Sequence, residues 1–124
     1  MHENEPHTLG QVFTKESPSS LVSILIEKFP DTRVRESGHY TSGEYVKMNF
    51  GKDIEFFFEH IDESEYLVAG EGANLKLLEE AAAQIAQFFG DRKFKCRFET
   101  YNDDDKLTSY SHYAWPPLRK PGED

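Results

Sequence analysis

Short segments in which apolar and polar residues alternate dominate this sequence, and they demand a sheet with one covered face and one open face. In the segment 44–50, Val46, Met48 and Phe50 fall on one side and polar or aromatic residues on the other. Period-two patterning of this kind is typical of a half-buried antiparallel strand. The same reasoning predicts further strands at 33–40, 54–60, 66–69, 93–101 and 106–113.

The segment before the first predicted strand has the signals of an amphipathic helix. Ser17 is a good helix cap, and Pro18 suits the first helical position, where an N–H is not needed. We expect the helix to stop at Phe29, because the residue before Pro30 avoids helical backbone angles. Its apolar stripe consists of Leu21, Ile24, Leu25 and Phe29, widened by Val22 and Ile26.

A second helix is predicted over 75–89, with Asn74 as its cap. Gly90 follows the last apolar residue, where we expect a left-handed glycine to end the helix. The element order is therefore helix, four strands, helix, two strands. This order predicts an α+β fold, a two-layer sandwich with a mostly antiparallel sheet and both helices on one face.

The chain has the length of one domain, and we expect a single domain over 1–124. Apolar residues make up only 37% of it, but the aromatic share of 14% supplies large buried side chains. Residues 1–16 and 116–124 are expected to be extended or flexible. Leu9, Val12 and Phe13 could still dock as an extended lead-in to the first helix.

The formal net charge of −9 limits the classes of partner. Such a chain is repelled by nucleic acid and by anionic membrane surfaces, whereas it attracts basic proteins. The single cysteine, Cys96, excludes an internal disulfide, and the N-terminus has no signal-peptide pattern. We therefore expect a cytoplasmic protein.

No catalytic, metal or cofactor signature emerges from the motifs. The segment 70–72, Gly-Glu-Gly, lies where phosphate loops lie, but its glutamate would repel phosphate, and we interpret it as a structural turn. The acidic segment 102–105 lacks calcium-loop spacing and is interpreted as a solvated turn. Cys96 lies between two inward phenylalanines and is expected to be a core residue. His39, His60 and His112 could meet only through strand pairing, so no metal or cofactor is predicted.

The outward sheet face is the most informative surface that the pattern predicts. Aromatic residues interleaved with charges are typical of protein-contact surfaces. A nucleic-acid platform would use the same mixture, but the acidic excess argues against it. Another possibility is that the tail with Trp115 and Leu118 folds over this face. The face carries Tyr45, Phe57, Tyr101 and Tyr110 among Lys47, Glu55, Glu59, Lys93, Lys95 and Arg97.

Glu55 and Glu59 lie on one side of their predicted strand. Two carboxylates can perform acid–base chemistry across a cleft, but nothing in the sequence predicts a cleft here. We expect them to pair across strands with Lys93, Lys95 or Arg97, if those strands are neighbours.

These observations favour a non-enzymatic, acidic protein-binding domain. Its sharpest form is an immunity or antitoxin-type inhibitor that neutralises a basic partner protein. We expect Asp62, Glu63 and Glu65 to form its acidic patch, with Glu71, Glu79 and Glu80 nearby in the sequence. The interface candidates are Tyr45, Glu55, Phe57, Glu59, Asp62, Glu63, Glu65, Tyr101 and Tyr110.

Two alternatives from other classes stay open at this point. One is a small enzyme or ligand-binding protein with a pocket between helices and sheet, on which Tyr40, Glu55, His60 and His112 would converge. The other is a homodimer that hides its aromatic sheet face against a second copy.

Overall fold

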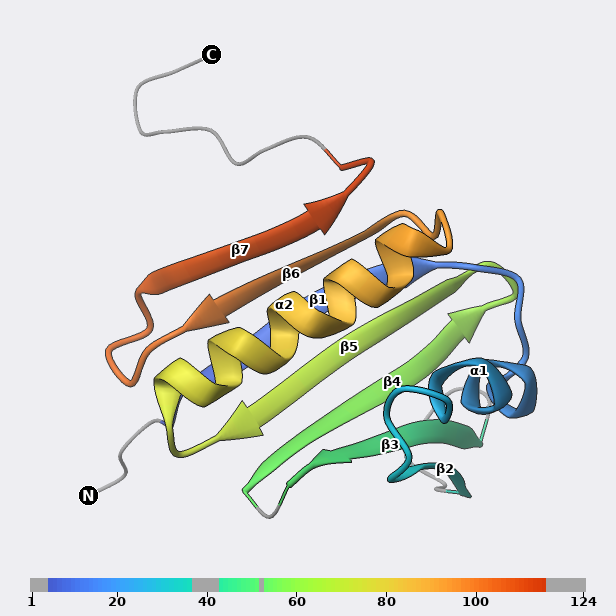
Figure 1. Cartoon of the computed structure of the whole chain (residues 1–124), viewed down its shortest axis with the longest axis horizontal. Helices are drawn as coiled ribbons and strands as arrows, with labels where there is room; N and C mark the ends of the chain where they lie inside the picture. The colour runs from blue at the N-terminus through green and yellow to red at the C-terminus, as the bar shows by residue number, and fades with distance from the viewer. Residues whose placement is uncertain (1–4, 37–42, 52, 116–124) are drawn as a thin grey trace.

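The computed structural model describes residues 5–36, 43–51 and 53–115, which form one seven-stranded antiparallel sheet and two helices (Figure 1). The strands lie in the order β2-β3-β4-β5-β1-β6-β7. The elements are β1 (His7–Phe13), α1 (Pro18–Leu25), β2 (Thr32–Glu36), β3 (Glu44–Phe50), β4 (Ile54–Asp62), β5 (Glu65–Gly72), α2 (Leu75–Asp91), β6 (Cys96–Tyr101) and β7 (Leu107–Tyr113).

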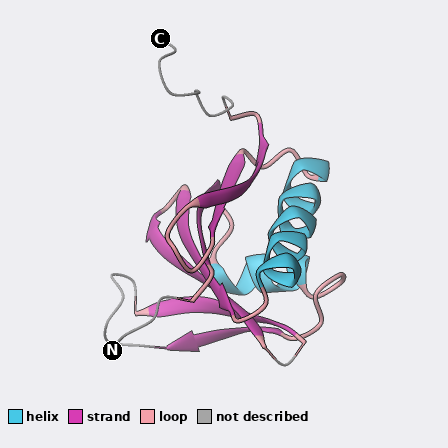
Figure 2. Ribbon diagram, turned by 90° about the vertical axis from the view of Figure 1, so that its left-hand side faces the viewer, coloured by secondary structure: helices cyan, strands magenta, loops and turns pink. Residues whose placement is uncertain are grey.

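The predicted α+β sandwich is confirmed. Both helices lie on the same side of the sheet (Figure 2). Helix α1 packs over β2 and β3, and α2 packs over β6 and β7. Burial alternates along the strands, so that Val46, Met48, Phe56 and Phe58 are fully covered beneath this layer. The other sheet face, which we call the open face, is covered by neither helix.

Strand β1 adds a seventh strand to the six that were predicted. It lies in the middle of the sheet, antiparallel to both β5 and β6. Alternation is weak here, because the residues that β1 turns toward the helices are Thr8, Gly10 and Val12. The Thr8 hydroxyl is satisfied by the Thr100 hydroxyl of β6, 2.8 Å away and fully buried. The lead-in segment is therefore a central strand.

The helix ends differ from the prediction in both helices. Helix α1 starts at Pro18 with Ser17 as its cap, as predicted, but it ends at Leu25. A turn follows, and the Phe29 N–H still bonds to the Leu25 carbonyl, which places the Phe29 ring in the core.

The prediction that Gly90 ends the second helix is wrong. Helix α2 continues through Gly90 to Asp91, and the residue with the left-handed backbone is Lys93, at a φ of 64°. Gly90 instead allows close packing, because a Cβ there would lie 3.2 Å from the Tyr113 ring of β7. The left-handed Lys93 also explains why β6 starts at Cys96 and not at the predicted position.

Strand boundaries agree best where alternation is strong. Strand β3 coincides with the prediction, and β4 and β5 are longer than predicted. Of the predicted strand 33–40, the structure shows β2 up to Glu36, and the segment 37–40 lies outside the described residues.

Aromatic side chains from both layers fill the core. The Phe89 ring of α2 contacts the rings of Phe58 and Phe98 at centroid distances of 6.1 and 6.4 Å. Tyr66 is fully buried, and its hydroxyl donates a 2.8 Å hydrogen bond to the Glu16 carbonyl. His60 stacks on Tyr66 with a centroid distance of 4.5 Å, on the helix side of the sheet.

The Gly-Glu-Gly segment at 70–72 is the end of β5, and the interpretation as a turn is wrong. Gly70 faces the helices, and the Phe56 ring occupies the space where its side chain would be. A Cβ at Gly70 would lie 2.4 Å from Phe56 Cε2. These glycines therefore allow side chains of β4 to pack closely against the β5 backbone in the core.

We predict that Gly70→Ala lowers the free energy of unfolding by about 1–3 kcal/mol, because the added methyl group overpacks the Phe56 ring. Urea denaturation monitored by circular dichroism measures the change. Ala69→Ser is the matched control, because Ala69 faces away from the core and a surface change costs less than about 0.5 kcal/mol. Equal stability of G70A and the wild type would contradict the packing role.

Candidate protein-binding site

The strand register arranges the side chains of the open face in rows that cross the whole sheet. Directly opposed residues in antiparallel strands point to the same face, so each row follows from the pairing. The two central rows are Arg35–Tyr45–Glu59–Leu67–Gln11–Arg97–His112 and Arg33–Lys47–Phe57–Ala69–Leu9–Glu99–Tyr110.

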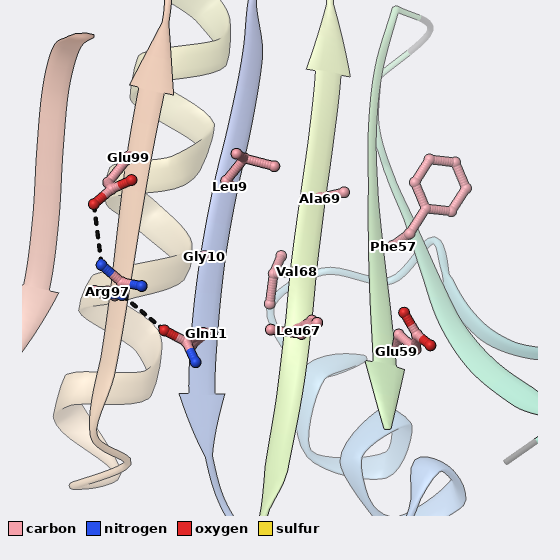
Figure 3. A pocket seen from close by; sticks show the side chains of 10 residues that line it. All are labelled: Leu9, Gly10, Gln11, Phe57, Glu59, Leu67, Val68, Ala69, Arg97 and Glu99. Carbon is pink, nitrogen blue, oxygen red and sulfur yellow. Dashed lines mark hydrogen bonds and ion pairs between the residues drawn. The ribbon is translucent and has the colours of Figure 1, made fainter. Parts of the chain in front are cut away.

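The centre of the open face is hollowed and apolar (Figure 3). Leu9 of β1 and Leu67 of β5 are 49% and 41% exposed, although they lie on the two central strands. Between them and Phe57 stands only the small side chain of Ala69, which leaves a hollow of about 470 Å³. Exposed leucines gathered in a concave surface mark a binding site more often than scattered ones do.

One wall of the hollow is a chain of polar side chains. The Gln11 amide donates to Glu65 at 2.6 Å and accepts from Arg97 Nε at 2.9 Å. Arg97 also donates to Glu99 at 3.1 Å, and the Tyr101 hydroxyl donates to the other Glu99 oxygen at 2.7 Å. This bond to the carboxylate raises the pKa of Tyr101 above its ordinary value. The wall is therefore held in place before any partner binds.

On the opposite side the hollow is lined by Phe57 and Glu59 of β4, and residues of β3 lie beyond them. The Phe57 ring lies 6.1 Å from the Tyr45 ring, between centroids. Lys47 Nζ lies 6.0 Å from the Phe57 centroid and 3.7 Å from a Glu55 carboxylate oxygen. This side thus presents an aromatic ring flanked by both signs of charge.

The hollow continues along β1 and β5 toward one end of the sheet. A neighbouring hollow shares the linings Leu9 and Ala69 and extends to His7, Glu5 and Glu71. Another shares Glu5 and Glu71 and reaches Asp53 and Glu55. Together they make one trough on the open face, apolar at Leu9, Leu67 and Ala69 and acidic at Glu5, Asp53, Glu55 and Glu71.

The acidic end of the trough gains further charge from the turn between β6 and β7. His7 Nε2 lies 3.9 Å from an Asp105 carboxylate oxygen, and the His7 ring stacks on Tyr101 at 5.2 Å. Asp103 and Asp104 are exposed in the same turn. Several carboxylates from different elements are thus gathered near one opening of the trough.

Most of the predicted interface residues lie on the open face. The register places Tyr45, Phe57, Tyr101, Tyr110, Glu55 and Glu59 there. Asp62, the last residue of β4, and Glu63 in the turn that follows are exposed at the end opposite to Glu71. Glu65 bonds to Gln11. Six residues of strand, about 20 Å, separate Glu65 from Glu71.

Glu79 and Glu80, which are near the predicted acidic patch in the sequence, do not adjoin this face. They belong to α2, which covers the other side of the sheet. The predicted acidic residues therefore belong to three separate surfaces, and of them only Glu55 and Glu71 line the acidic end of the trough.

The expected pairing of Glu55 and Glu59 with β6 is also wrong. Strands β5 and β1 lie between β4 and β6, and Glu55 pairs with Lys47 on β3 instead. Lys93 precedes β6 in a left-handed turn, so it does not join the outward row.

The described residues of the enzyme alternative, Glu55, His60 and His112, do not converge. Glu55 and His112 lie on the open face of strands β4 and β7, with three strands between them. His60 points to the helix side, and Tyr40 and His39 lie outside the described residues. Within the described part of the chain, no cluster of three or more His, Cys, Asp or Glu residues could hold a metal ion.

Trp115 covers one end of the open face in part. Its ring lies 4.8 Å from Lys95 Nζ, 5.0 Å from Arg97 Cζ and 5.5 Å from the Phe13 centroid. Leu118 lies outside the described residues. The Trp115 contacts leave the apolar hollow open at Leu9 and Leu67.

No family model matches this chain, and no curated protein or solved structure matches it significantly. The function must therefore be inferred from the site itself. Neither helix in the described ranges is long and apolar enough to cross a membrane.

Sequence reasoning missed Leu9, Gln11, Leu67 and Ala69, which form the floor of the trough. Leu67 and Ala69 lie at outward positions of the predicted strand 66–69. Leu9 could be placed only after β1 was known to pair with β5. An apolar residue at the outward position of an alternating strand is the signal that could have found them.

Cys96 is a core residue and not a nucleophile. Its side chain is fully buried, and its Sγ lies 3.9 Å from the Ala86 carbonyl oxygen. Burial raises the pKa of the Cys96 thiol to about 11, so the thiol stays protonated at neutral pH.

This raised pKa predicts a loss of stability at high pH. The folded state keeps a proton that the unfolded thiol releases near its ordinary pKa of 9.0, so stability is complete below that pH and is lost toward pH 11. The free energy of unfolding should fall by about 1.4 kcal/mol per pH unit in this window. Urea titrations of the wild type and Cys96→Ala at several pH values measure it, and C96A should lack this part of the slope. Equal slopes would contradict the assignment.

Proposed function

We propose that this chain is a non-enzymatic protein-binding domain that holds a basic segment of a partner protein in the trough on its open face. The observation that carries the proposal is the continuity of the exposed leucines on β1 and β5 with four carboxylates at one end of the sheet. An apolar side chain of the partner would occupy the hollow at Leu9 and Leu67. A lysine or arginine would lie about 13 Å further along, near Glu71, four strand residues from Leu67.

Apolar contact supplies most of the affinity in this arrangement. Burying apolar surface gains roughly 25 cal/mol per Å², so covering two half-exposed leucines and the Phe57 ring amounts to a few kcal/mol. The polar wall from Glu65 to Tyr101 is already hydrogen-bonded, so little side-chain freedom is lost on binding. A preformed apolar centre with a polar rim is the usual anatomy of a protein interface.

Charge determines which partner approaches and how fast. The net charge of −9 and the carboxylates at one end of the trough attract a basic protein and repel nucleic acid. The open face itself carries both signs, with Arg33, Arg35, Lys47 and Arg97 among the acids. These cations restrict the fit to a segment with a matching charge pattern.

An inhibitor of a toxic enzyme is the most specific form of this proposal. Enzymes that act on nucleic acid have basic active sites, because they bind phosphate. An acidic protein with an apolar anchor blocks such a site by occupying the place of the substrate. An inhibitor of this kind would use both the acidic end of the trough and its apolar hollow.

We predict that Leu9→Gln with Leu67→Gln abolishes capture of the partner, because it removes the apolar anchor site at two exposed positions without opening the core. Loss of two anchors typically weakens binding by tenfold or more, about 1.4 kcal/mol or above. Purified tagged protein would be used to capture partners from cells that naturally make this chain. Quantitative mass spectrometry identifies the proteins retained.

Leu77→Gln is the matched control for this experiment. Leu77 is as exposed as Leu9, at 49%, but it lies on α2, on the other side of the sheet. A basic protein retained by the wild type and L77Q and lost by L9Q/L67Q supports the proposal. If the double variant retains the same proteins as L77Q, the trough is not the binding site.

The acidic end yields a separate prediction about kinetics. Glu55→Gln with Glu71→Gln should slow association with the captured partner by about tenfold at low salt, since electrostatic steering acts on the association rate. The difference should shrink at 0.5 M salt because the charges are screened. Surface plasmon resonance measures both rates.

Glu79→Gln with Glu80→Gln is the matched control, with the same change in charge on α2. If both double variants slow association equally, net charge matters and the acidic end of the trough has no special part.

A further inference from the structure

The two edges of the sheet differ in how they are protected against pairing with another strand. Strand β2 has five residues, and three of them, Arg33, Arg35 and Glu36, are charged. Strand β7 has seven residues, Leu-Thr-Ser-Tyr-Ser-His-Tyr, with no formal charge at neutral pH and no proline. Charged residues and prolines are what natural edge strands use to prevent pairing.

Most of β7 is also regular enough to accept a further strand. Its register shift against β6 lies between Thr100 and Tyr101, which affects only the first residues of β7. From Ser109 to Tyr113 the pairing is continuous. Among the described strands β7 pairs only with β6, so it is an edge strand of the sheet.

We propose that β7 pairs antiparallel with β7 of a second copy of this chain, so that one sheet continues across both copies. A strand edge accepts only an extended backbone, and an isologous two-fold pairing uses the same residues twice. A chain that is 30% charged presents no charge on this one strand, which lets two copies approach there without local repulsion.

The surface beside the edge fits a second copy. A hollow of about 570 Å³ lies between α2 and β7, lined on the helix by small residues, Ala83, Ala86 and Gly90, together with Gln87 and Asp91. In a two-fold β7 pair each copy brings its own α2 toward the same axis, on the same side of the joined sheet. Small side chains allow two helices to come close, so the helices add contact area to the strand pairing.

Charge and area together set the strength of this dimer. A stable interface buries at least about 1,000 Å², which a short strand pair reaches only with the help of the helices. The two copies also repel each other over long distances, with −9 on each. We therefore expect a dissociation constant in the micromolar range that decreases as salt rises, because salt screens the repulsion.

This inference is independent of the proposed function. Strand β6 separates β7 from the trough on β1 and β5, so both troughs of the dimer stay open. The salt dependences are opposite, since salt weakens binding to a basic partner and strengthens the dimer. Failure of one proposal is thus distinguishable from failure of the other.

The test compares the oligomeric state of the full chain and its variants by sedimentation velocity from 1 µM to 1 mM, at low and high salt. His112→Lys changes an exposed residue of β7. Two-fold pairing centred on Ser111, the middle of the continuous stretch, would bring the two lysines about 7 Å apart as diagonal neighbours. Ser111→Lys with His112→Lys adds a second charge on the other side of the strand. We expect H112K to weaken dimerisation at least tenfold and the double variant to be monomeric.

Ser19→Lys with Ser23→Lys is the matched control for the double variant. It adds the same two charges at exposed positions of α1, over the opposite half of the sheet, and should dimerise like the wild type. Circular dichroism verifies that each variant is folded, and hydrogen exchange should show β7 amides protected in the dimer. A wild type that is monomeric at 1 mM in high salt overturns the proposal, as does a dimer that H112K and the double variant leave intact.

Discussion

The insertion of β1 between β5 and β6 is the constraint on which the rest of the structure depends. Strands β2 to β5 are joined by short connections and pair in sequence order, and β6 and β7 form a separate hairpin. Only β1 joins the two groups, through a full ladder on each side. The buried Thr8–Thr100 hydrogen bond fixes one of these ladders and leaves no polar atom of either threonine side chain unpaired. The same strand places Leu9 and Gln11 at the centre of the open face. The trough therefore exists because β1 joins the two groups of strands.

Charge and apolar surface are separated along the strands of the open face. Cross-strand neighbours in the middle, such as Gln11 and Arg97, satisfy one another. At the acidic end the neighbours are Glu55 and Glu71, which lie directly opposite each other on β4 and β5. Like charges in opposed positions destabilise a sheet slightly. A basic group from a partner would relieve this repulsion, whereas the middle of the face gains little from charge and much from apolar contact.

The parts of the fold that could be predicted are those in which the sequence pattern and the packing agree. Strand β3 and the start of α2 follow from alternation and from the Asn74 cap, and no distant residue is needed to place them. Strand β1 could not be predicted in this way, because its inward residues include Thr8 and Gly10, which become core residues only when β6 supplies Thr100 and Phe98. The end of α2 likewise depends on a residue that is distant in the sequence. A glycine is required at position 90 because the Tyr113 ring packs closely there, and Tyr113 lies on β7, further along the chain.

The sequence pattern predicts which residues of the candidate site lie on the open face, but it does not predict the residues at the centre of the site. Alternation alone placed Tyr45, Phe57 and Tyr101 on the outward side, and the register confirms that placement. Strand order decided the rest, since it put β5 and β1 between the charged rows of β4 and β6. A pairing such as Glu59 with Arg97 is plausible from the sequence, but two strands separate these residues in the sheet. Sequence order gives the neighbours within a hairpin and says little about a strand that is inserted from the N-terminus.

The short segment 69–72 of β5 explains why the two faces of the sheet differ so strongly at this place. Its inward residues, Gly70 and Gly72, have no side chains, so Phe56 and Ile54 of β4 fill the core there. Its outward residue Ala69 is too small to fill the space between Phe57 and Leu9, so the open face is hollow at the same level. Small residues on both sides of one strand therefore produce close packing where neighbouring rings can move in, and a trough where no second layer exists. The hollow is a consequence of the residues that the strand presents, and its walls are supplied by strands that the core already fixes.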